Sequence, residues 1–170
     1  MLPVMTSNAE LRDFLSGTSF FGGLPGPLVD KVIELLKERR AAKGETLFEE
    51  GQTGNSMYIV RSGAVLVERK CPHGTEARLL MMRKGDFFGV TALIEMEPRP
   101  FGARAEQDSL LYELTNADLY KLYKEDLKGY VMVVQNIARE LCRRLRKAAK
   151  RIADLEDQLH QRSSPRRPDA

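Results

Sequence analysis

The C-terminal third of the chain carries an apolar repeat that alternates steps of four and three residues from residue 127 to residue 159. These steps place every member on one stripe of an α-helix, because the helix has 3.6 residues per turn. At 1.5 Å per residue the stripe is about 50 Å long. Its members are Leu127, Val131, Val134, Ala138, Leu141, Leu145, Ala148, Ile152, Leu155 and Leu159.

A stripe of this length exceeds what one small domain can cover, so its distal half is expected to pack on another helix. Arg151 and Glu156 flank the stripe five positions apart, the spacing of an attractive pair across a parallel dimer. A helix that packs along its own domain is the alternative. The homodimer interface predicted by the heptads consists of Val131, Val134, Ala138, Leu141, Leu145, Ala148, Ile152 and Leu155.

Short apolar runs between residues 44 and 115 alternate with Gly, Pro, Asn, Asp or Ser, which predicts strands in an antiparallel sandwich or barrel. The runs are GETLFEEG, MYIVRSG, AVLVERK, ARLLMM and SLLYEL. Before them, the pattern of LPGPLVDKVIELLKERR (24–40) predicts a helix with Pro27 in its first turn. After them, Asn116 is expected to cap a short helix through Leu122, and the long helix to begin near residue 125.

The composition of the 170 residues fits one domain with appendages, because 42 % are hydrophobic. The boundaries predicted are a flexible N-terminus at 1–12, the domain at 13–124, the long helix at 125–161 and a disordered tail at 162–170. With 27 basic and 24 acidic residues, no general polyanion-binding surface is expected. Two cysteines without metal-ligand spacing predict no metal site and favour a reducing cytoplasm. No secretory signal, membrane span or catalytic arrangement is predicted.

The loop FFGVTALIEMEPRPFGARA (87–105) places an arginine ten residues after a glycine. Together with the Gly-punctuated strands and the long helix, this loop resembles the cyclic nucleotide-binding domain family, over most of residues 14–145. The family includes catabolite-activator-type regulators, regulatory subunits of the cAMP-dependent kinase and cyclic-nucleotide-gated channels. The resemblance implies an α+β fold, an antiparallel β-roll (double-stranded β-helix or jelly-roll) flanked by N-terminal helices and a long C-terminal helix.

In this family the loop is a phosphate-binding cassette, whose backbone N–H groups and arginine bind a cyclic phosphate. The resemblance carries this role to Gly89, Val90, Thr91, Ala92, Arg99 and Pro100.

Three positions depart from the family pattern. Val90 replaces the glutamate that holds the ribose hydroxyl, Pro100 has no N–H for the phosphate, and Gly102 has no hydroxyl. Losing the first two contacts costs about 3 to 6 kcal/mol, or about 10² to 10⁴ in affinity. Weak or absent cAMP binding is therefore predicted.

Arg99 has two interpretations. It either binds an external phosphate or acidic ligand, or it pairs with a nearby carboxylate, for which Glu95, Glu97 and Glu106 are the candidates.

The long helix also carries a basic stretch between residues 139 and 151. It is interpreted either as a solvated face or as a collar for an acidic protein partner, with a membrane surface or nucleic acid ranked lower. The stretch comprises Arg139, Arg143, Arg144, Arg146, Lys147, Lys150 and Arg151, with Glu140 among them.

DNA reading is not expected, because about ten residues follow Leu159, too few for a helix-turn-helix. The function predicted is that of a non-enzymatic, homodimeric signalling or adaptor protein of the cytoplasm, without a cofactor. The alternative is a receptor for a cyclic nucleotide or cyclic dinucleotide, in which Arg99 and the amides near Gly89 bind the ligand and signal through the long helix.

Overall fold

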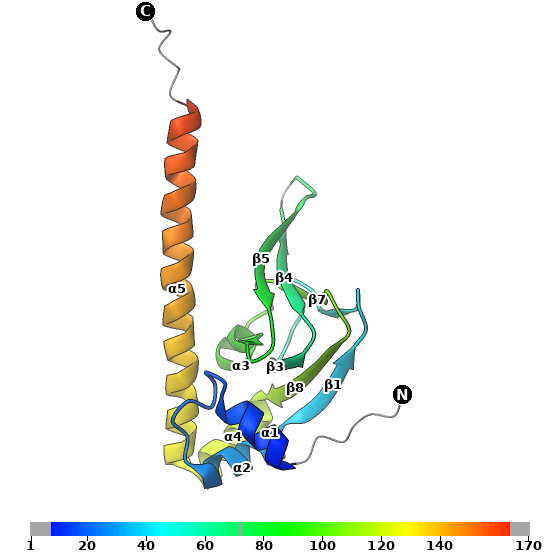
Figure 1. Cartoon of the computed structure of the whole chain (residues 1–170), viewed down its shortest axis with the longest axis vertical. Coiled ribbons are helices and arrows are strands. Elements are labelled where there is room, and N and C mark those ends of the chain that lie inside the picture. Colours follow the sequence, from blue (N-terminus) through cyan, green and yellow to red (C-terminus); the bar gives the residue numbers. More distant parts are fainter. Residues whose placement is uncertain (1–7, 72, 164–170) are drawn as a thin grey trace, which may run out of the picture.

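The structure is a computed structural model that describes residues 8–71 and 73–163 (Figure 1). The helices are α1 (Asn8–Ser16), α2 (Gly26–Leu35), α3 (Val90–Glu95), α4 (Asn116–Glu125) and α5 (Leu127–Ser163). The strands are β1 (Lys37–Ala41), β2 (Thr46–Phe48), β3 (Ser56–Ser62), β4 (Val65–Lys70), β5 (Glu76–Met82), β6 (Phe87–Phe88), β7 (Gly102–Ala105) and β8 (Ser109–Thr115).

The strands of the described residues form two antiparallel sheets, in the orders β1-β8-β3-β6 and β2-β7-β4-β5. Figure 1 shows the sheets curving into a roll, with α1, α2 and α4 at one end and α5 alongside. The predicted α+β fold, an antiparallel β-roll flanked by N-terminal helices and a long C-terminal helix, is confirmed. The five predicted runs correspond to β2, β3, β4, β5 and β8.

The sequence prediction missed the strands β1, β6 and β7. The helix predicted through residue 40 ends at Leu35, and Lys37–Ala41 pairs instead along its whole length with β8. Strand pairing therefore overrides the helical pattern of this charged segment. In β7, Gly102–Ala105, the inward side chains are those of Ala103 and Ala105, which carry little strand propensity.

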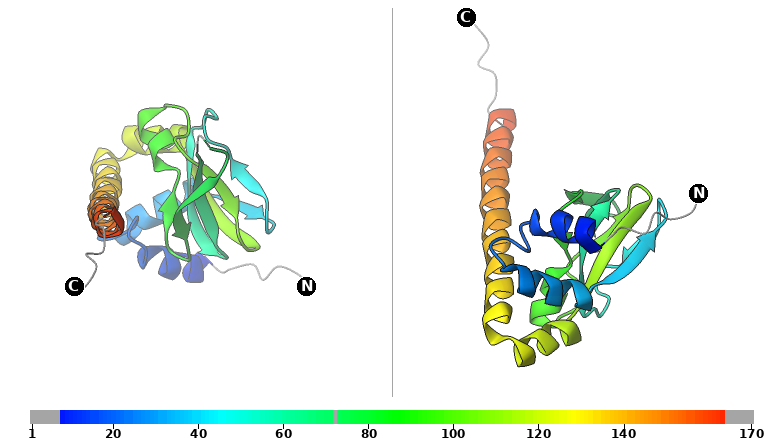
Figure 2. Two further views of the ribbon diagram at one scale, coloured as in Figure 1. Left: turned by 90° about the horizontal axis from the view of Figure 1, so that it is seen from above. Right: turned by 60° about the horizontal axis from the view of Figure 1, so that its bottom comes forward.

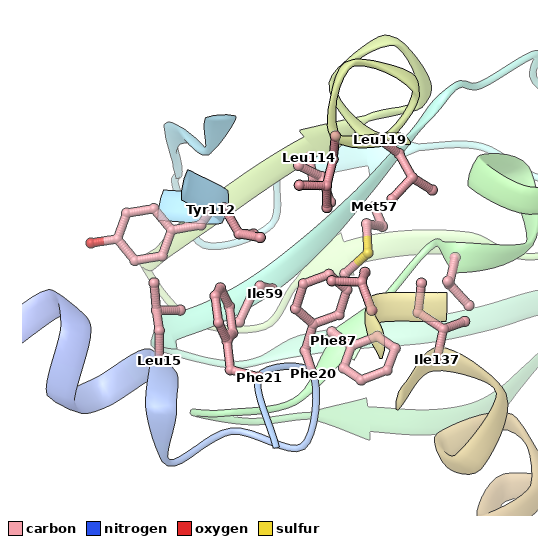
Figure 3. Packing of buried hydrophobic residues seen from close by; sticks show 14 of the residues in the cluster. Leu15, Phe20, Phe21, Met57, Ile59, Phe87, Tyr112, Leu114, Leu119 and Ile137 are labelled. Carbon is pink, nitrogen blue, oxygen red and sulfur yellow. The ribbon is translucent and has the colours of Figure 1, made fainter. Parts of the chain in front are cut away.

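The first sheet has apolar side chains on both faces. One face of β3 and β8, with Ile59 and Tyr112, packs under the helices against Phe20 and Phe21 (Figure 3). The opposite face, with Tyr58 and Val60, packs against the second sheet inside the roll. This alternation follows from the period of two of a β-strand, and it gives the molecule two cores that share one sheet.

The connection from β8 to α4 is closed by a capping box. The Thr115 hydroxyl accepts a hydrogen bond from the Asp118 amide (3.2 Å), and the Asp118 carboxylate accepts one from the Thr115 amide (3.0 Å). The prediction of Asn116 as the cap was wrong by one residue, and α4 ends at Glu125 instead of Leu122. The Asn116 side chain instead donates to the Leu93 carbonyl oxygen (3.0 Å), which ties α4 to α3.

The first half of α5 is fixed to the domain by residues that lie outside the predicted dimer interface. Val133 and Ile137 are buried in the core under the helices. Between them Asn136 donates to the carbonyl oxygens of Phe20 and Gly22, at 2.9 Å each. Figure 2 shows that the C-terminal end of α5 continues past the rest of the fold.

Two of the expected segments, the flexible N-terminus and the disordered tail, extend beyond the residues that the structure describes. Helix α1 begins at Asn8, within the segment expected to be a flexible N-terminus, and residues 1–7 lie outside the described part. Helix α5 continues through Ser163, and residues 164–170 of the expected tail also lie outside it. Among residues 8–71 and 73–163, no helix is long and apolar enough to cross a membrane.

Candidate functional site

The candidate site is the cassette, which consists of β6, Gly89, α3 and the loop to Arg99. Gly89 has φ +78° and caps the N-terminus of α3. A side chain at this position would be strained by that φ, and its Cβ would lie 2.7 Å from Nη1 of Arg99. A glycine here is therefore required by both conformation and space.

Helix α3 turns three of its six residues toward the protein interior. Val90, Ala92 and Leu93 are buried, and Val90 is only 3 % exposed within the core under the helices. Thr91 is half-buried, whereas Pro100 is exposed. The position that holds a glutamate in the ligand-binding pattern is thus an apolar core position in this chain.

The guanidinium of Arg99 is buried, with the residue 4 % exposed. Its Nη1 donates a hydrogen bond to the Gly89 carbonyl oxygen (3.0 Å), and its Nη2 lies 3.4 Å from Oγ of Ser56. Its Cζ lies 3.9 Å from the centroid of the Phe48 ring. We call Phe48, Gly54, Ser56 and Gly89 the Arg99 cage.

Gly54 closes the cage on the remaining edge of the guanidinium. A Cβ on Gly54 would collide with Nε, Cζ and Nη2 of Arg99. The Nε atom is buried and has no hydrogen-bond partner among the described residues. Burial lowers the pKa of Arg99, and the charges of Tyr58 and Glu113 act in the opposite direction.

The backbone of Arg99 is held as firmly as its side chain. Its amide donates to the Gln52 carbonyl oxygen (2.9 Å), and its carbonyl oxygen accepts from the Gly51 amide (2.8 Å). The turn that contains Gly51 and Gly54 therefore clamps Arg99 in place. None of the predicted carboxylate partners takes part: Glu106 pairs with Arg78 and Arg104, and no ion pair joins Glu95 or Glu97 to Arg99 in the described structure.

Aromatic side chains fill the roll next to the cage. The Tyr58 ring stacks on Phe88 with centroids 5.4 Å apart, and Phe48 stacks on Tyr58 at 6.1 Å. The Tyr58 hydroxyl accepts from Ser56 (3.2 Å) and donates to Glu113 (3.0 Å), which extends the polar contacts of Arg99 to that carboxylate. Two hollows, of about 170 and 440 Å³, lie along β2 and the loop after it, and neither is lined by Arg99 or Gly89.

The predicted dimer residues lie on α5 away from its own domain. Leu145 is 70 % exposed, and Val131, Ala138, Leu141, Ala148, Ile152 and Leu155 are also exposed, while Val134 is half-buried. Arg151 and Glu156 are exposed and make no ion pair in the described structure. The domain is contacted by Val133, Asn136 and Ile137 instead, so packing on the domain does not use these exposed apolar residues.

The basic stretch divides into two groups. Arg139 donates to Asn136 (2.8 Å), and both Arg143 and Arg144 donate to Glu140. Arg144 also donates to the Phe87 carbonyl oxygen (2.5 Å). The remaining four residues form no ion pair within the described part of the chain: Arg146, Lys147, Lys150 and Arg151.

Sequence reasoning missed the residues that surround Arg99 and those that fix α5. Gly54 lies among the glycines that separate the predicted strands, and no local pattern marks Ser56 or Phe48 as neighbours of a residue more than 40 positions away. Asn136 could have been noticed as a polar residue between the apolar Val133 and Ile137 on one helix face. No group of three or more metal-ligating side chains is assembled among residues 8–71 and 73–163.

Comparison with known proteins supplies the family. The model of the cyclic nucleotide-binding domain matches residues 38–126, which contain the roll and the cassette. The cyclic AMP receptor protein of Thermus thermophilus is 31 % identical over 134 residues, 79 % of this chain and 60 % of that protein. A CRP-like cAMP-activated global transcriptional regulator of Mycobacterium tuberculosis is 26 % identical over 149 residues, 85 % of this chain and 63 % of that protein.

A solved structure gives the same result. The crystal structure of the Thermus thermophilus catabolite activator protein superposes with a TM-score of 0.73 at 29 % identity, over 82 % of this chain and 63 % of that chain. The chain thus spans about three fifths of the length of the relatives it matches. The family match covers more than half of the 170 residues, and the matched range contains Gly89, α3 and Arg99. The chain belongs to the cyclic nucleotide-binding domain family.

Proposed function

We propose that this chain is a non-enzymatic, homodimeric signalling or adaptor protein of the cytoplasm that binds cAMP weakly or not at all. The observation that carries the proposal is the Arg99 cage. The guanidinium that pairs with the ligand phosphate in the family pattern is enclosed by Phe48, Gly54 and Gly89. A phosphate would have to displace these contacts before it reached the arginine.

The sequence departures act in the same direction as the cage. Val90 offers no acceptor to a ribose hydroxyl, and Pro100 offers no amide to a phosphate. Together they cost about 3 to 6 kcal/mol of binding free energy, and the cost of displacing Arg99 from Gly89 adds to this. A site of micromolar affinity would become one of about 0.1 to 10 mM.

Thermal unfolding with and without nucleotide tests this part of the proposal. The panel consists of cAMP, cGMP and cyclic dinucleotides at about 10 μM, a concentration at which a site of about 0.1 to 10 mM stays almost empty, and no rise in Tm is expected. A ligand that binds only the folded state stabilises it by RT ln(1 + c/Kd) at ligand concentration c, so Tm rises once c approaches Kd. A rise that is present in the unmodified chain and lost in Arg99→Met would contradict the proposal and support a receptor.

The dimer is proposed from the exposed apolar stripe of α5. Leu145, Ile152 and Leu159 are exposed and lie seven residues apart, as in a coiled-coil seam. In a parallel pair of helices, Arg151 would face Glu156 of the second copy, and both are without an ion-pair partner within this chain's described residues. Light scattering at tens of micromolar tests this, because a monomeric mass would overturn the dimer.

A genuine receptor for a cyclic nucleotide or cyclic dinucleotide is the second candidate. It is favoured by the unpaired, buried Nε of Arg99 and by relatives named for cAMP. In this case the ligand would select a minor conformation in which Arg99 has left the cage, and the change would pass to α5. The thermal panel separates the two candidates.

An acidic protein is the partner that we propose for the unpaired part of the basic stretch, at Arg146, Lys147, Lys150 and Arg151. No aromatic side chain is interleaved with these four residues, so stacking on nucleic-acid bases has no support. DNA binding predicts a steep loss of affinity with salt, which gel shifts at low and high salt measure. A DNA shift at low salt that is lost at high salt would support DNA binding and overturn this ranking.

A further inference from the structure

Two tyrosine rings are exposed near the junction where α4 meets α5. Tyr120 is 55 % exposed and Tyr123 is 46 % exposed, and their rings stack with centroids 5.9 Å apart. Helix α4 does not need them for its packing, because Leu119 and Leu122 already fill the core under the helices. Adjacent rings at this exposure leave apolar surface in water, which is typical of a surface that binds a partner.

The apolar surface continues into the start of α5. The ring of Tyr130 contacts the ring of Tyr123 edge-on, with centroids 5.3 Å apart. Leu127 is 57 % exposed and lies three residues before Tyr130, on the same side of α5. We call Tyr120, Tyr123 and Leu127 the elbow patch. Figure 1 shows α4 and the start of α5 at the end of the molecule opposite the C-terminus, so the patch lies at that end.

The two carboxylates at the junction of α4 and α5 have partners within the chain. Asp126 accepts hydrogen bonds from the Lys31 side chain (3.2 Å) and the Gly129 amide (2.9 Å). Glu125 lies 4.0 Å from Nζ of Lys121, one helical turn earlier. The negative charges beside the elbow patch are therefore largely compensated.

The lysines that remain give the junction a positive charge. Lys124 and Lys128 are exposed, and neither forms an ion pair among the described residues. Nζ of Lys124 lies 4.7 Å from the centroid of the Tyr120 ring, so this charge lies directly beside the patch. The charge of Lys128 acts on Asp126 without an ion pair, as one of the causes that lower the pKa of Asp126. An anionic partner is thus favoured by charge.

The elbow patch lies outside both hollows of the roll. Neither of the hollows described above includes a residue of α4 or α5. A bilayer surface needs no cavity, because exposed tyrosine rings enter the headgroup region and lysines reach the lipid phosphates. Tyrosine and lysine suit this boundary, since each joins an apolar body to a polar tip.

We propose that the elbow patch docks the chain on an anionic lipid bilayer. The three apolar side chains of the patch enter the headgroup region, while Lys124 and Lys128 bind the anionic groups of the lipids. The attachment lies at the surface, so it is reversible and weakens as salt rises. The inference goes beyond the proposed function and does not require the dimer. A parallel dimer through α5 would bring two elbow patches to the same end and strengthen binding through avidity.

Co-flotation of the full chain with vesicles tests the proposal. Vesicles of phosphatidylcholine with about one third phosphatidylserine are compared with vesicles of phosphatidylcholine alone. We expect binding to the anionic vesicles that falls as salt rises, and binding to the neutral vesicles that is weaker by about tenfold or more. Absence of binding to the anionic vesicles would overturn the proposal.

Two double variants separate the apolar and charged parts of the patch. Tyr120→Gln with Tyr123→Gln removes the rings, and we expect the partition coefficient to fall by about tenfold or more. Lys124→Gln with Lys128→Gln removes the charges and should lower it by about 30-fold, because each lysine near an anionic leaflet contributes about a factor of five. Thermal unfolding without vesicles checks that both variants fold. Unchanged binding in either variant would overturn the proposal.

The matched control removes the same charge elsewhere on α5. Lys147→Gln with Lys150→Gln changes two exposed lysines of the basic stretch and should leave vesicle binding unchanged. An equal loss of binding in this control and in the lysine variant of the elbow would mean that total charge holds the chain on the vesicle. That result would overturn the assignment to the elbow patch.

Tyr123→Trp reports on the patch directly, because the chain contains no tryptophan of its own. Its emission should shift to shorter wavelength on the anionic vesicles, as the indole leaves water for the headgroup region. Vesicle binding without this shift would place the contact on another surface and overturn the proposal. Oligothymidine is the competing probe, because tyrosines beside lysines also stack on nucleic-acid bases. Quenching of the reporter by oligothymidine, without a response to vesicles, would overturn the proposal as well.

The oligomeric state is measured separately by sedimentation, so that this inference and the proposed dimer can fail independently. A monomeric chain that binds anionic vesicles through the elbow patch would uphold the inference and remove the dimer. A dimeric chain that binds no vesicle would do the reverse.

Discussion

The guanidinium of Arg99 lies on the ring of Phe48, with Cζ 3.9 Å from the ring centroid. A cation over an aromatic face is stabilised by the ring quadrupole, by about 2 kcal/mol or more when both groups are desolvated. With the hydrogen bond to Gly89, this contact offsets part of the cost of burying the charge. The arginine therefore remains charged inside the roll without a carboxylate in direct contact.

Substituting Gly54 tests how tightly the cage encloses Arg99. Gly54→Ala places a methyl group against the guanidinium, and we expect a loss of about 1 to 3 kcal/mol in the free energy of unfolding, as for other overpacked sites. Gly102→Ala is the matched control, because its nearest neighbours would be 3.7 Å away. It is expected to be neutral or to stabilise by about 0.4 to 1 kcal/mol. Urea unfolding measures both.

The double variant Gly54→Ala with Arg99→Met completes the test of the cage. Methionine is flexible and has no guanidinium to collide with the added methyl group, so the penalty of Gly54→Ala should shrink in that background. Equal penalties with and without Arg99 would mean that the collision is not with this side chain.

Much of the roll could be predicted from the sequence, because its signals are local. The runs that became β3 and β4 are bounded by turn residues such as Gly63, and their inward residues are large and apolar. The pattern of α5 is equally local. The sequence of β1, in contrast, is charged and continues the helical pattern that precedes it. Only its pairing with β8, about 70 residues later, makes it a strand.

In the candidate site, the sequence predicts Gly89 and Arg99 but not the residues that contact Arg99. Gly89 and Arg99 follow from their spacing in one loop. Gly54 and Ser56 reach Arg99 only after β2, β3 and the cassette have assembled, so nothing near them in the sequence indicates the contact. The same reason explains why carboxylates close to Arg99 in sequence were the expected partners, whereas the structure provides a backbone carbonyl.

Restoring the glutamate of the ligand-binding pattern is expected to destabilise the fold. Val90 lies in the core under the helices, so Val90→Glu would bury a carboxylate without a partner, at a cost of about 3 kcal/mol or more. Thr91→Glu, at a half-buried neighbouring position, is the control and should cost less than about 1 kcal/mol. Thermal unfolding at pH 7 compares the two.

The same substitution also tests whether the cassette retains a usable backbone. Val90→Glu combined with Pro100→Ala is expected to show no rise in Tm with millimolar cAMP, because the inward direction of position 90 keeps the carboxylate away from a ligand. A clear rise in Tm would mean that the backbone of the loop can still bind cAMP and that only the contacts at positions 90 and 100 are missing.

Glu140 predicts an acid-sensitive contribution to stability. Burial raises the pKa of Glu140, but hydrogen bonds from Arg143 and Arg144 outweigh it, so its pKa is lowered overall. A lowered folded pKa stabilises the native state above the unfolded value of about 4.3, and this stability is lost as the pH falls through the folded pKa.

Glu140→Gln should therefore be less stable than the unmodified chain at pH 7, and the difference should shrink as the pH falls from about 5 toward 3. Glu125→Gln is the control, since Glu125 makes an exposed contact with Lys121 at 4.0 Å. Urea unfolding across this pH range measures both. A difference between the Glu140 variant and the unmodified chain that stays constant with pH would contradict the prediction.

The apolar stripe of α5 gives the sharpest test of the dimer. Leu145 is 70 % exposed and makes no part of either core, so Leu145→Glu should leave the monomer fold intact. In a parallel coiled coil the two glutamates would face each other at one seam position, and we expect the dimer to weaken by about 100-fold or more. Sedimentation at several concentrations measures the change.

Ala153→Glu, an exposed position outside the stripe on the same helix, is the control and should keep the mass and concentration-dependent Tm of the unmodified chain. Equal masses for all three chains would mean that the stripe does not hold the copies together.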